Sequence, residues 1–272
     1  MLLPFMLLLQ SAALPAFDEV RMRDCLTLAE TDPPSAIINA SEWQKNKGGY
    51  LAQACLATAF SEQNDHKKAA QNFVAAAQAA QIKNDKIASA FWAQAGNEAL
   101  ANGDLAAAQQ NLTAALEGQT LQRIPRSEAL LNRARIYVAG GQLETAAKDL
   151  SQARTIMPND SAAWLLSATL ARRMNDLNGA QNFIKTAAAL SPSDARVALE
   201  AGNIAAAAGA YDIAREQWLQ TIRISPQSVQ ADTARKLVEQ LAVIGPAGKL
   251  PITGSMPQAL TPKVNAEPPE TR

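Results

Sequence analysis

The side chains best suited to catalysis or metal binding are scarce in this sequence. His66 is the only histidine, and Cys25 and Cys55 are the only cysteines. Imidazole and thiolate groups act as general bases, nucleophiles and metal ligands, but such sites need several of them held together. The sequence contains no Cys-His cluster, no CxxC pair and no glycine-rich phosphate loop. It therefore predicts no catalytic residue, no metal site and no cofactor, and His66 is expected to lie on the surface.

The composition predicts helices that pack closely. Apolar residues make up 48% of the chain and aromatic residues only 5%, and much of the apolar share is alanine. Alanine is the best helix former, because it loses no side-chain entropy and buries no polar group. The 25 basic and 25 acidic residues give a net charge of zero, so nucleic-acid binding through bulk electrostatics has no support.

The N-terminal stretch "MLLPFMLLLQSAALPA" is apolar and carries no charged side chain. Its apolar run is too short to span a bilayer, and small residues follow it, which is typical of a short secretory signal. Residues 1–16 are predicted to be a signal peptide, the only part of the chain to meet a membrane, and the protein is predicted to be periplasmic or secreted. Because no Lys or Arg precedes the run, a hydrophobic first helix of a cytoplasmic protein remains the alternative.

Export would decide the state of the two cysteines. Two thiols in an oxidising compartment predict one disulfide, between Cys25 and Cys55. The alternative is two buried free thiols that pack as small hydrophobic groups.

A period of 34 residues runs through the second half of the chain. Prolines end three apolar helical stretches at this spacing, at Pro158, Pro192 and Pro226. Twelve residues before each proline stands an alanine, and seventeen before it a turn residue, namely Gly141, Asn175 and Gly209. Small residues on one helix face let helices approach closely, the turn residue reverses the chain, and proline ends the second helix.

This pattern resembles the tetratricopeptide repeat (TPR), over about residues 50–226. The resemblance implies an all-α, right-handed α-solenoid of about five helical hairpins, at 49–83, 89–122, 127–160, 161–194 and 195–228. No single hairpin can bury its apolar face alone, so neighbours must stack.

The residues outside the repeats are predicted to flank the solenoid. Residues 17–48 are interpreted as an irregular N-terminal helical hairpin, which a Cys25–Cys55 bridge would join to the first repeat. Residues 229–244 are predicted to form a capping helix. Residues 245–272 contain six prolines and no hydrophobic period, which predicts a disordered tail.

TPR proteins usually bind peptides or helices in a groove lined by the first helix of each repeat. The resemblance places ten residues of this sequence on that surface: Asn97, Leu131, Arg135, Leu165, Thr169, Arg172, Arg173, Arg196, Leu199 and Asn203. Arginines in such a groove could hold a carboxylate through paired hydrogen bonds. The alternative is a solvated face that binds nothing.

The resemblance thus implies a non-enzymatic adaptor or scaffold that binds a protein or peptide in the cell envelope. An acidic segment or a C-terminal carboxylate is the candidate ligand, and nucleic acid is not expected. Two alternatives remain: a structural subunit of a stable envelope assembly, or a cytoplasmic co-chaperone-like module if the N-terminus is not a signal.

Overall fold

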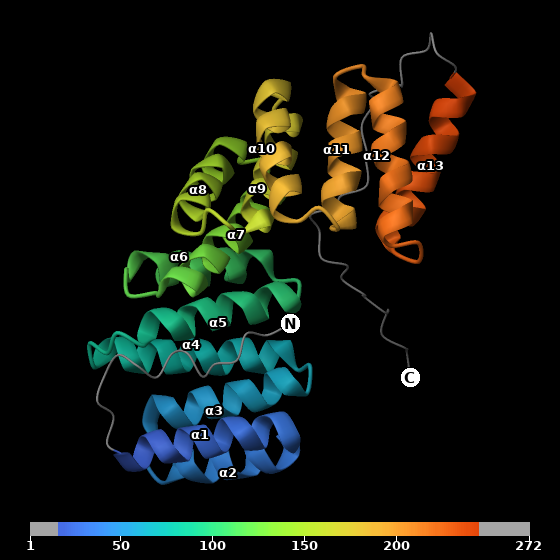
Figure 1. Cartoon of the computed structure of the whole chain (residues 1–272). Helices are drawn as coiled ribbons and strands as arrows, with labels where there is room; N and C mark the ends of the chain where they lie inside the picture. The colour runs from blue at the N-terminus through green and yellow to red at the C-terminus, as the bar shows by residue number, and fades with distance from the viewer. Residues whose placement is uncertain (1–15, 245–272) are drawn as a thin grey trace, which may run out of the picture. The chain divides into compact units, whose positions relative to one another are not determined.

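The computed structural model describes residues 16–244, and all regular structure in this range is α-helical (Figure 1). The helices are α1 Ala16–Thr31, α2 Pro33–Lys45, α3 Gly49–Glu62, α4 His66–Ile82, α5 Ala88–Ala101, α6 Leu105–Glu117, α7 Arg123–Ala139, α8 Leu143–Ile156, α9 Ser161–Arg173, α10 Leu177–Leu190, α11 Ala195–Ala207, α12 Tyr211–Ile224 and α13 Val229–Ile244. The predicted signal peptide, apart from Ala16, and the predicted tail lie outside the described residues. Between residues 16 and 244, no helix combines the length and apolarity needed to cross a membrane.

The helices form two compact units, and the boundary falls inside α7, after Ile136. In the first unit, α1, α2 and α3 pack on one another, α3 packs against α4, α4 against α5, and α5 against α6. In the second unit, α8 to α13 follow the same order, with further contacts of α9 with α11 and of α11 with α13. Packing between consecutive hairpins is the organisation of an α-solenoid, so the predicted all-α solenoid fold is confirmed.

The hairpins turn at residues in the left-handed backbone conformation. The three turn residues singled out in the sequence have this conformation, with φ of 74° at Gly141, 61° at Asn175 and 76° at Gly209. The corresponding residues of the two earlier hairpins, Asn64 and Gly103, have φ of 59° and 78°. Glycine adopts positive φ at little cost, and asparagine tolerates it better than most other residues.

An aspartate after the turn caps three of the second helices. The side chains of Asp65, Asp104 and Asp176 accept hydrogen bonds from backbone N–H groups three residues later, at 3.1, 3.0 and 2.9 Å. These bonds satisfy donors that the first turn of a helix leaves unpaired. The residues before α8 and α12, Gln142 and Ala210, make no such side-chain bond.

Small residues in the first helices allow close packing against the second helices. Gly202 of α11 lies against the fully buried ring of Trp218 in α12, and a Cβ atom at position 202 would collide with that ring. Gly96 of α5 faces Leu112 of α6, where a Cβ atom would approach Leu112 Cγ to 2.6 Å. Backbone proximity of this kind is what the small residues of the repeat provide.

The two cysteines lie side by side in the first unit. Cys25 belongs to α1 and Cys55 to α3, both side chains are buried, and their Cα atoms are 6.0 Å apart. Disulfides usually join Cα atoms 4.4–6.8 Å apart. The fold therefore permits the predicted bridge between the N-terminal hairpin and the first repeat.

One boundary region differs from the sequence interpretation. The repeat boundaries predicted from the sequence place residues 123–126 between two repeats, whereas in the structure they form the first turn of α7. Pro125 is compatible with this position, because backbone N–H groups in the first turn of a helix have no partner within the helix.

Candidate partner-binding face

The ten predicted groove residues lie on the first helices of four hairpins, α5, α7, α9 and α11. In the first unit, Asn132 of α7 joins two of them. Its amide nitrogen donates to Asn97 Oδ1 at 2.9 Å, and its Oδ1 accepts from Arg135 Nη1 at 2.5 Å. Leu131, the third predicted residue of this unit, is buried in the core. Here the structure brings Asn97 and Arg135 together through Asn132, which sequence reasoning missed.

The α9 residues Leu165 and Thr169 contribute mainly to packing. Leu165 is half-buried against an apolar cluster that includes Ile184 and Val197. Thr169 is buried, and its hydroxyl donates to the Leu165 carbonyl at 3.1 Å. Of these two residues, only Leu165 has a side chain that is partly exposed and could contact a partner.

Arg172 of α9 forms a buried ion pair with Glu200 of α11. Arg172 Nε donates to Glu200 Oε1 at 2.7 Å, and Nη2 donates to Oε2 at 3.2 Å. The side chains are only 15% and 8% exposed. Paired hydrogen bonds between guanidinium and carboxylate are strong and directional, and a charge this deeply buried needs its partner. Arg172 was predicted as a ligand for a partner, but it already holds a carboxylate of its own chain.

The carboxylate of Glu200 is also tied to α12 through Asn203. The Asn203 amide nitrogen donates to Glu200 Oε2 at 3.2 Å, and Asn203 Oδ1 accepts from Trp218 Nε1 at 3.2 Å. One polar network thus runs from α9 through α11 to α12. Its effect is to orient Asn203 and Arg172 toward the protein's own side chains.

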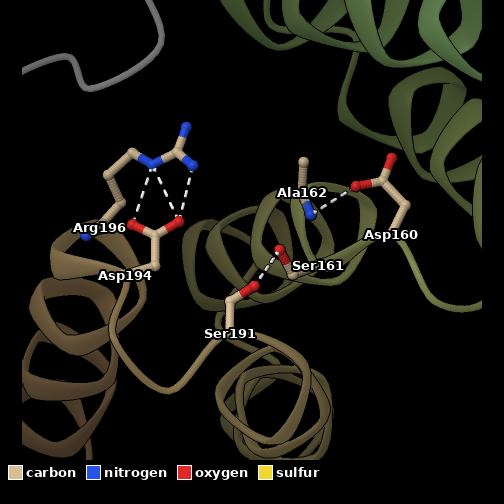
Figure 2. Close-up of polar contacts among 6 residues, drawn as sticks. All are labelled: Asp160, Ser161, Ala162, Ser191, Asp194 and Arg196. Atoms are coloured by element: carbon tan, nitrogen blue, oxygen red, sulfur yellow. Dashed lines mark hydrogen bonds and ion pairs between the residues drawn. The ribbon is translucent and has the colours of Figure 1, made fainter.

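Arg196 is paired in the same way at the start of α11 (Figure 2). Its Nε donates to both carboxylate oxygens of Asp194 at 3.1 and 3.2 Å, and Nη2 donates to Oδ2 at 2.6 Å. Asp194 also accepts from the Arg196 backbone N–H at 2.8 Å and so caps the helix. The bond from Arg196 is the main reason why the pKa of Asp194 lies below its usual value. Unlike Arg172, Arg196 is 60% exposed.

Two further contacts in this region hold the helix starts in place, as Figure 2 shows. Asp160 caps α9 by accepting from the Ala162 backbone N–H at 2.9 Å. Ser191, at the end of α10, donates to the Ser161 hydroxyl at the start of α9, with 2.9 Å between the oxygens. The loops before α9 and α11 are therefore fixed by short-range polar contacts.

Arg173 stands apart from the other arginines of α9 and α11. It is exposed, and no carboxylate in residues 16–244 is bonded to it. Partial burial of its guanidinium lowers its pKa, the neighbouring charge of Arg172 lowers it further, and the charge of Glu200 opposes both effects. Within the described part of the chain, Arg173 is thus the one arginine of these two helices without a carboxylate bonded to it.

Four side chains form a continuous stripe along α11, which is the first helix of its hairpin. Arg196, Leu199, Glu200 and Asn203 follow the i, i+3, i+4, i+7 spacing of one helix face. Leu199 is half-buried against the cluster that contains Trp218. The stripe combines an exposed ion pair, a partly exposed leucine and a buried ion pair, and its charges cancel.

His66 reaches the surface as predicted, but it is half-buried and has a partner that the sequence analysis did not identify. Its Nδ1 lies 2.8 Å from Glu98 Oε2, and its side chain is only 29% exposed. The other oxygen of Glu98, a buried residue of α5, accepts from the Ser61 hydroxyl at 2.7 Å. The imidazole therefore joins the first repeat to the second. Across residues 16–244, no three His, Cys, Asp or Glu side chains are grouped so that they could hold a metal ion.

Comparison with protein families places these helices in a known repeat class. Family models described as "Tetratricopeptide repeat" match residues 93–161 and residues 137–202. The chain is a tetratricopeptide repeat protein. The matched ranges include α9 and most of α11, so they cover Arg172 and Glu200 and end just before Asn203.

Solved TPR structures share the fold at low sequence identity. PilF of Pseudomonas aeruginosa is 17% identical with a TM-score of 0.64, over 80% of this chain and 96% of that one. PilW, described as a widely conserved type IV pilus biogenesis factor, is 19% identical with a TM-score of 0.65, over 82% and 100%. YrrB, described as a TPR protein with an unusual peptide-binding site, is 19% identical with a TM-score of 0.57, over 72% and 96%. A search of curated proteins gives no match.

Proposed function

We propose that this TPR protein is a non-enzymatic adaptor that binds a segment of another protein across the first helices of its repeats. The supporting observation is the row of side chains on α9 and α11. Leu165, Leu199 and Asn203 remain partly exposed there, and Arg196 is exposed. Partly exposed leucines next to amide groups suit a peptide or helix, which offers apolar side chains and backbone hydrogen bonds.

The acidic ligand suggested by the arginines has less support than the binding face itself. Arg172 and Arg196 each hold a carboxylate of this chain, and Arg135 donates to Asn132. Among the four predicted groove arginines, Arg173 is the one for which an acidic side chain or a C-terminal carboxylate remains a direct candidate.

Affinity capture from envelope extract tests the adaptor function. The mature protein is immobilised, and the captured proteins are identified and their stoichiometry is measured. One client that is substoichiometric and exchangeable supports the adaptor. A complex of fixed stoichiometry supports a structural subunit instead, and an empty eluate contradicts both.

We infer that the protein acts after export to the cell envelope. The support is the apolar run followed by small residues in 1–16, together with two cysteines whose positions permit a disulfide. Intact-mass analysis of the native protein should show a chain that begins between Ser11 and Phe17. A cytoplasmic pool that retains Met1–Leu9 would contradict export.

The Cys25–Cys55 disulfide is a separate proposal with its own measurement. Alkylation of the native protein without reductant, followed by mass spectrometry, should label neither cysteine. Labelling of both cysteines in protein taken from its own compartment would contradict the bridge, and the N-terminal hairpin would then pack through buried thiols alone.

A further inference from the structure

Carboxylates stand beside two arginines of α9 and α11, and they affect which ligands the surface of these two helices can bind. We propose that Asp194 and Glu200 determine the specificity of this face, because they neutralise Arg196 and Arg172. The face would then take a protein segment that has no acidic side chain opposite α9 and α11. This inference rests on the proposed adaptor function and deepens it.

The buried pair excludes a competing carboxylate at Arg172. An acidic side chain that took hold of Arg172 would have to displace Glu200, whose side chain is 8% exposed. Within residues 16–244, Glu200 would keep only the hydrogen bond from the Asn203 amide, and a buried carboxylate without a cation is strongly unfavourable. Arg172 is therefore closed to acidic ligands unless the repeat opens.

The exposed pair of Asp194 and Arg196 opposes a partner carboxylate because Asp194 is held next to the guanidinium. Asp194 is two residues from Arg196, and its cap bond to the Arg196 backbone N–H fixes it beside the guanidinium. A group held in this way competes at an effective concentration far above that of a free partner. Asp194 thus occupies the Nε–Nη2 edge of the guanidinium, and its charge opposes any carboxylate that approaches the remaining Nη1 side.

The exposed Arg173 has little effect on which segment the face binds. It is a single exposed cation, and exposed single ion pairs contribute little to affinity. A segment without acidic residues can pass it, since a long guanidinium side chain reorients toward water.

The test compares two blocked synthetic peptides, one of alternating Leu and Glu and one of alternating Leu and Gln, for binding to the full chain. The variant Asp194→Asn removes the charge and keeps the cap, because Asn is as good an N-cap as Asp. Glu200→Gln is the second variant, since its amide oxygen still accepts from Arg172. Asp212→Asn is the control: Asp212 is exposed in the first turn of α12, and its loss changes the net charge equally.

The wild type should bind the Leu-Gln peptide at least as tightly as the Leu-Glu peptide. Asp194→Asn should bind the Leu-Glu peptide about two- to fivefold more tightly than the wild type does, because Arg196 is exposed, and high salt should remove the gain. Asp212→Asn should show no gain. Melting curves confirm that each variant is folded.

Three results would overturn the inference. These are equal binding of the Leu-Glu peptide by the wild type and both variants, an equal gain in Asp212→Asn, and no binding of that peptide by either variant. None of them decides whether the protein is an adaptor, because capture of the native client requires no gain of binding. If affinity capture recovers no client but Asp194→Asn gains affinity for the Leu-Glu peptide, the adaptor function is rejected while the role of the two carboxylates is supported.

Discussion

At the scale of single residues, the contact of Gly202 with Trp218 has a direct consequence for stability. Gly202→Leu should destabilise the protein by about 1–3 kcal/mol or more, because the ring of Trp218 is fully buried and cannot move aside. Ala210→Leu is the control, since Ala210 is a partly exposed residue before α12. Thermal unfolding followed by circular dichroism should rank Gly202→Leu well below Ala210→Leu. Equal melting temperatures would show that α11 and α12 pack differently.

The buried ion pair allows a second test at this scale. Arg172→Met should cost about 3–5 kcal/mol, because it leaves Glu200 buried without its cation. The double variant Arg172→Met/Glu200→Met should recover most of that loss, because apolar side chains of similar volume often replace a buried pair at little cost. Urea unfolding of the single and double variants measures the coupling. Additive losses would mean that the two side chains do not depend on each other.

At the scale of helices, the missing cap of α12 predicts a stabilising change. Ala210→Asp should raise the free energy of unfolding by about 1 kcal/mol, because Ala210 stands where Asp65, Asp104 and Asp176 cap other second helices. Asp176→Ala should lower it by a similar amount. If Ala210→Asp leaves the melting temperature unchanged or lower, the start of α12 does not have the cap geometry described.

The cap of α11 should also make stability depend on pH. The pKa of Asp194 is lowered in the folded state, chiefly by its bond with Arg196, so the folded protein favours the carboxylate. The stabilisation is complete above the unfolded pKa of about 3.9 and is lost as the pH falls through the lower folded value. Asp194→Asn should reduce the dependence of the free energy of unfolding on pH, measured by urea unfolding between pH 2 and 6. An unchanged pH profile would place the acid sensitivity elsewhere.

The helices and their turns could be predicted because each hairpin is specified by residues within one repeat. The pairing of charges could not be predicted, because it joins different repeats. Gly141, Asn175 and Gly209 could be recognised as turns from their spacing, since each hairpin needs a positive φ at that point. The partners of Arg172 and His66 come from the next repeat, and their distances depend on how neighbouring hairpins are stacked. One signal could have been used: Glu98 and Glu200 are carboxylates within alanine-rich first helices, where burial calls for a cationic or hydrogen-bonding partner.

At the scale of the whole molecule, the proposed disulfide should affect one end of the chain only. In the chain-entropy model, closing a loop with a sequence separation of 30 stabilises the fold by about 3–4 kcal/mol. Reduction should speed amide hydrogen exchange in α1 and α2 and leave α9 to α12 unchanged, because each hairpin of a solenoid contacts mainly its neighbours. Cys25→Ala/Cys55→Ala should reproduce this without reductant. Faster exchange throughout the chain would indicate a single cooperative unit.

The central claim is that a protein partner lies across the first helices, and site-specific photocrosslinking tests it most directly. A photoreactive amino acid is placed at Arg196 on the first helix α11 and, as the control, at Ile213 on the second helix α12. The Arg196 side chain is 60% exposed and Ile213 is 59% exposed, so solvent access is matched. In the native host, position 196 should crosslink to one defined protein and position 213 to none. The same product from position 213, or a product from position 213 alone, would contradict binding across the first helices.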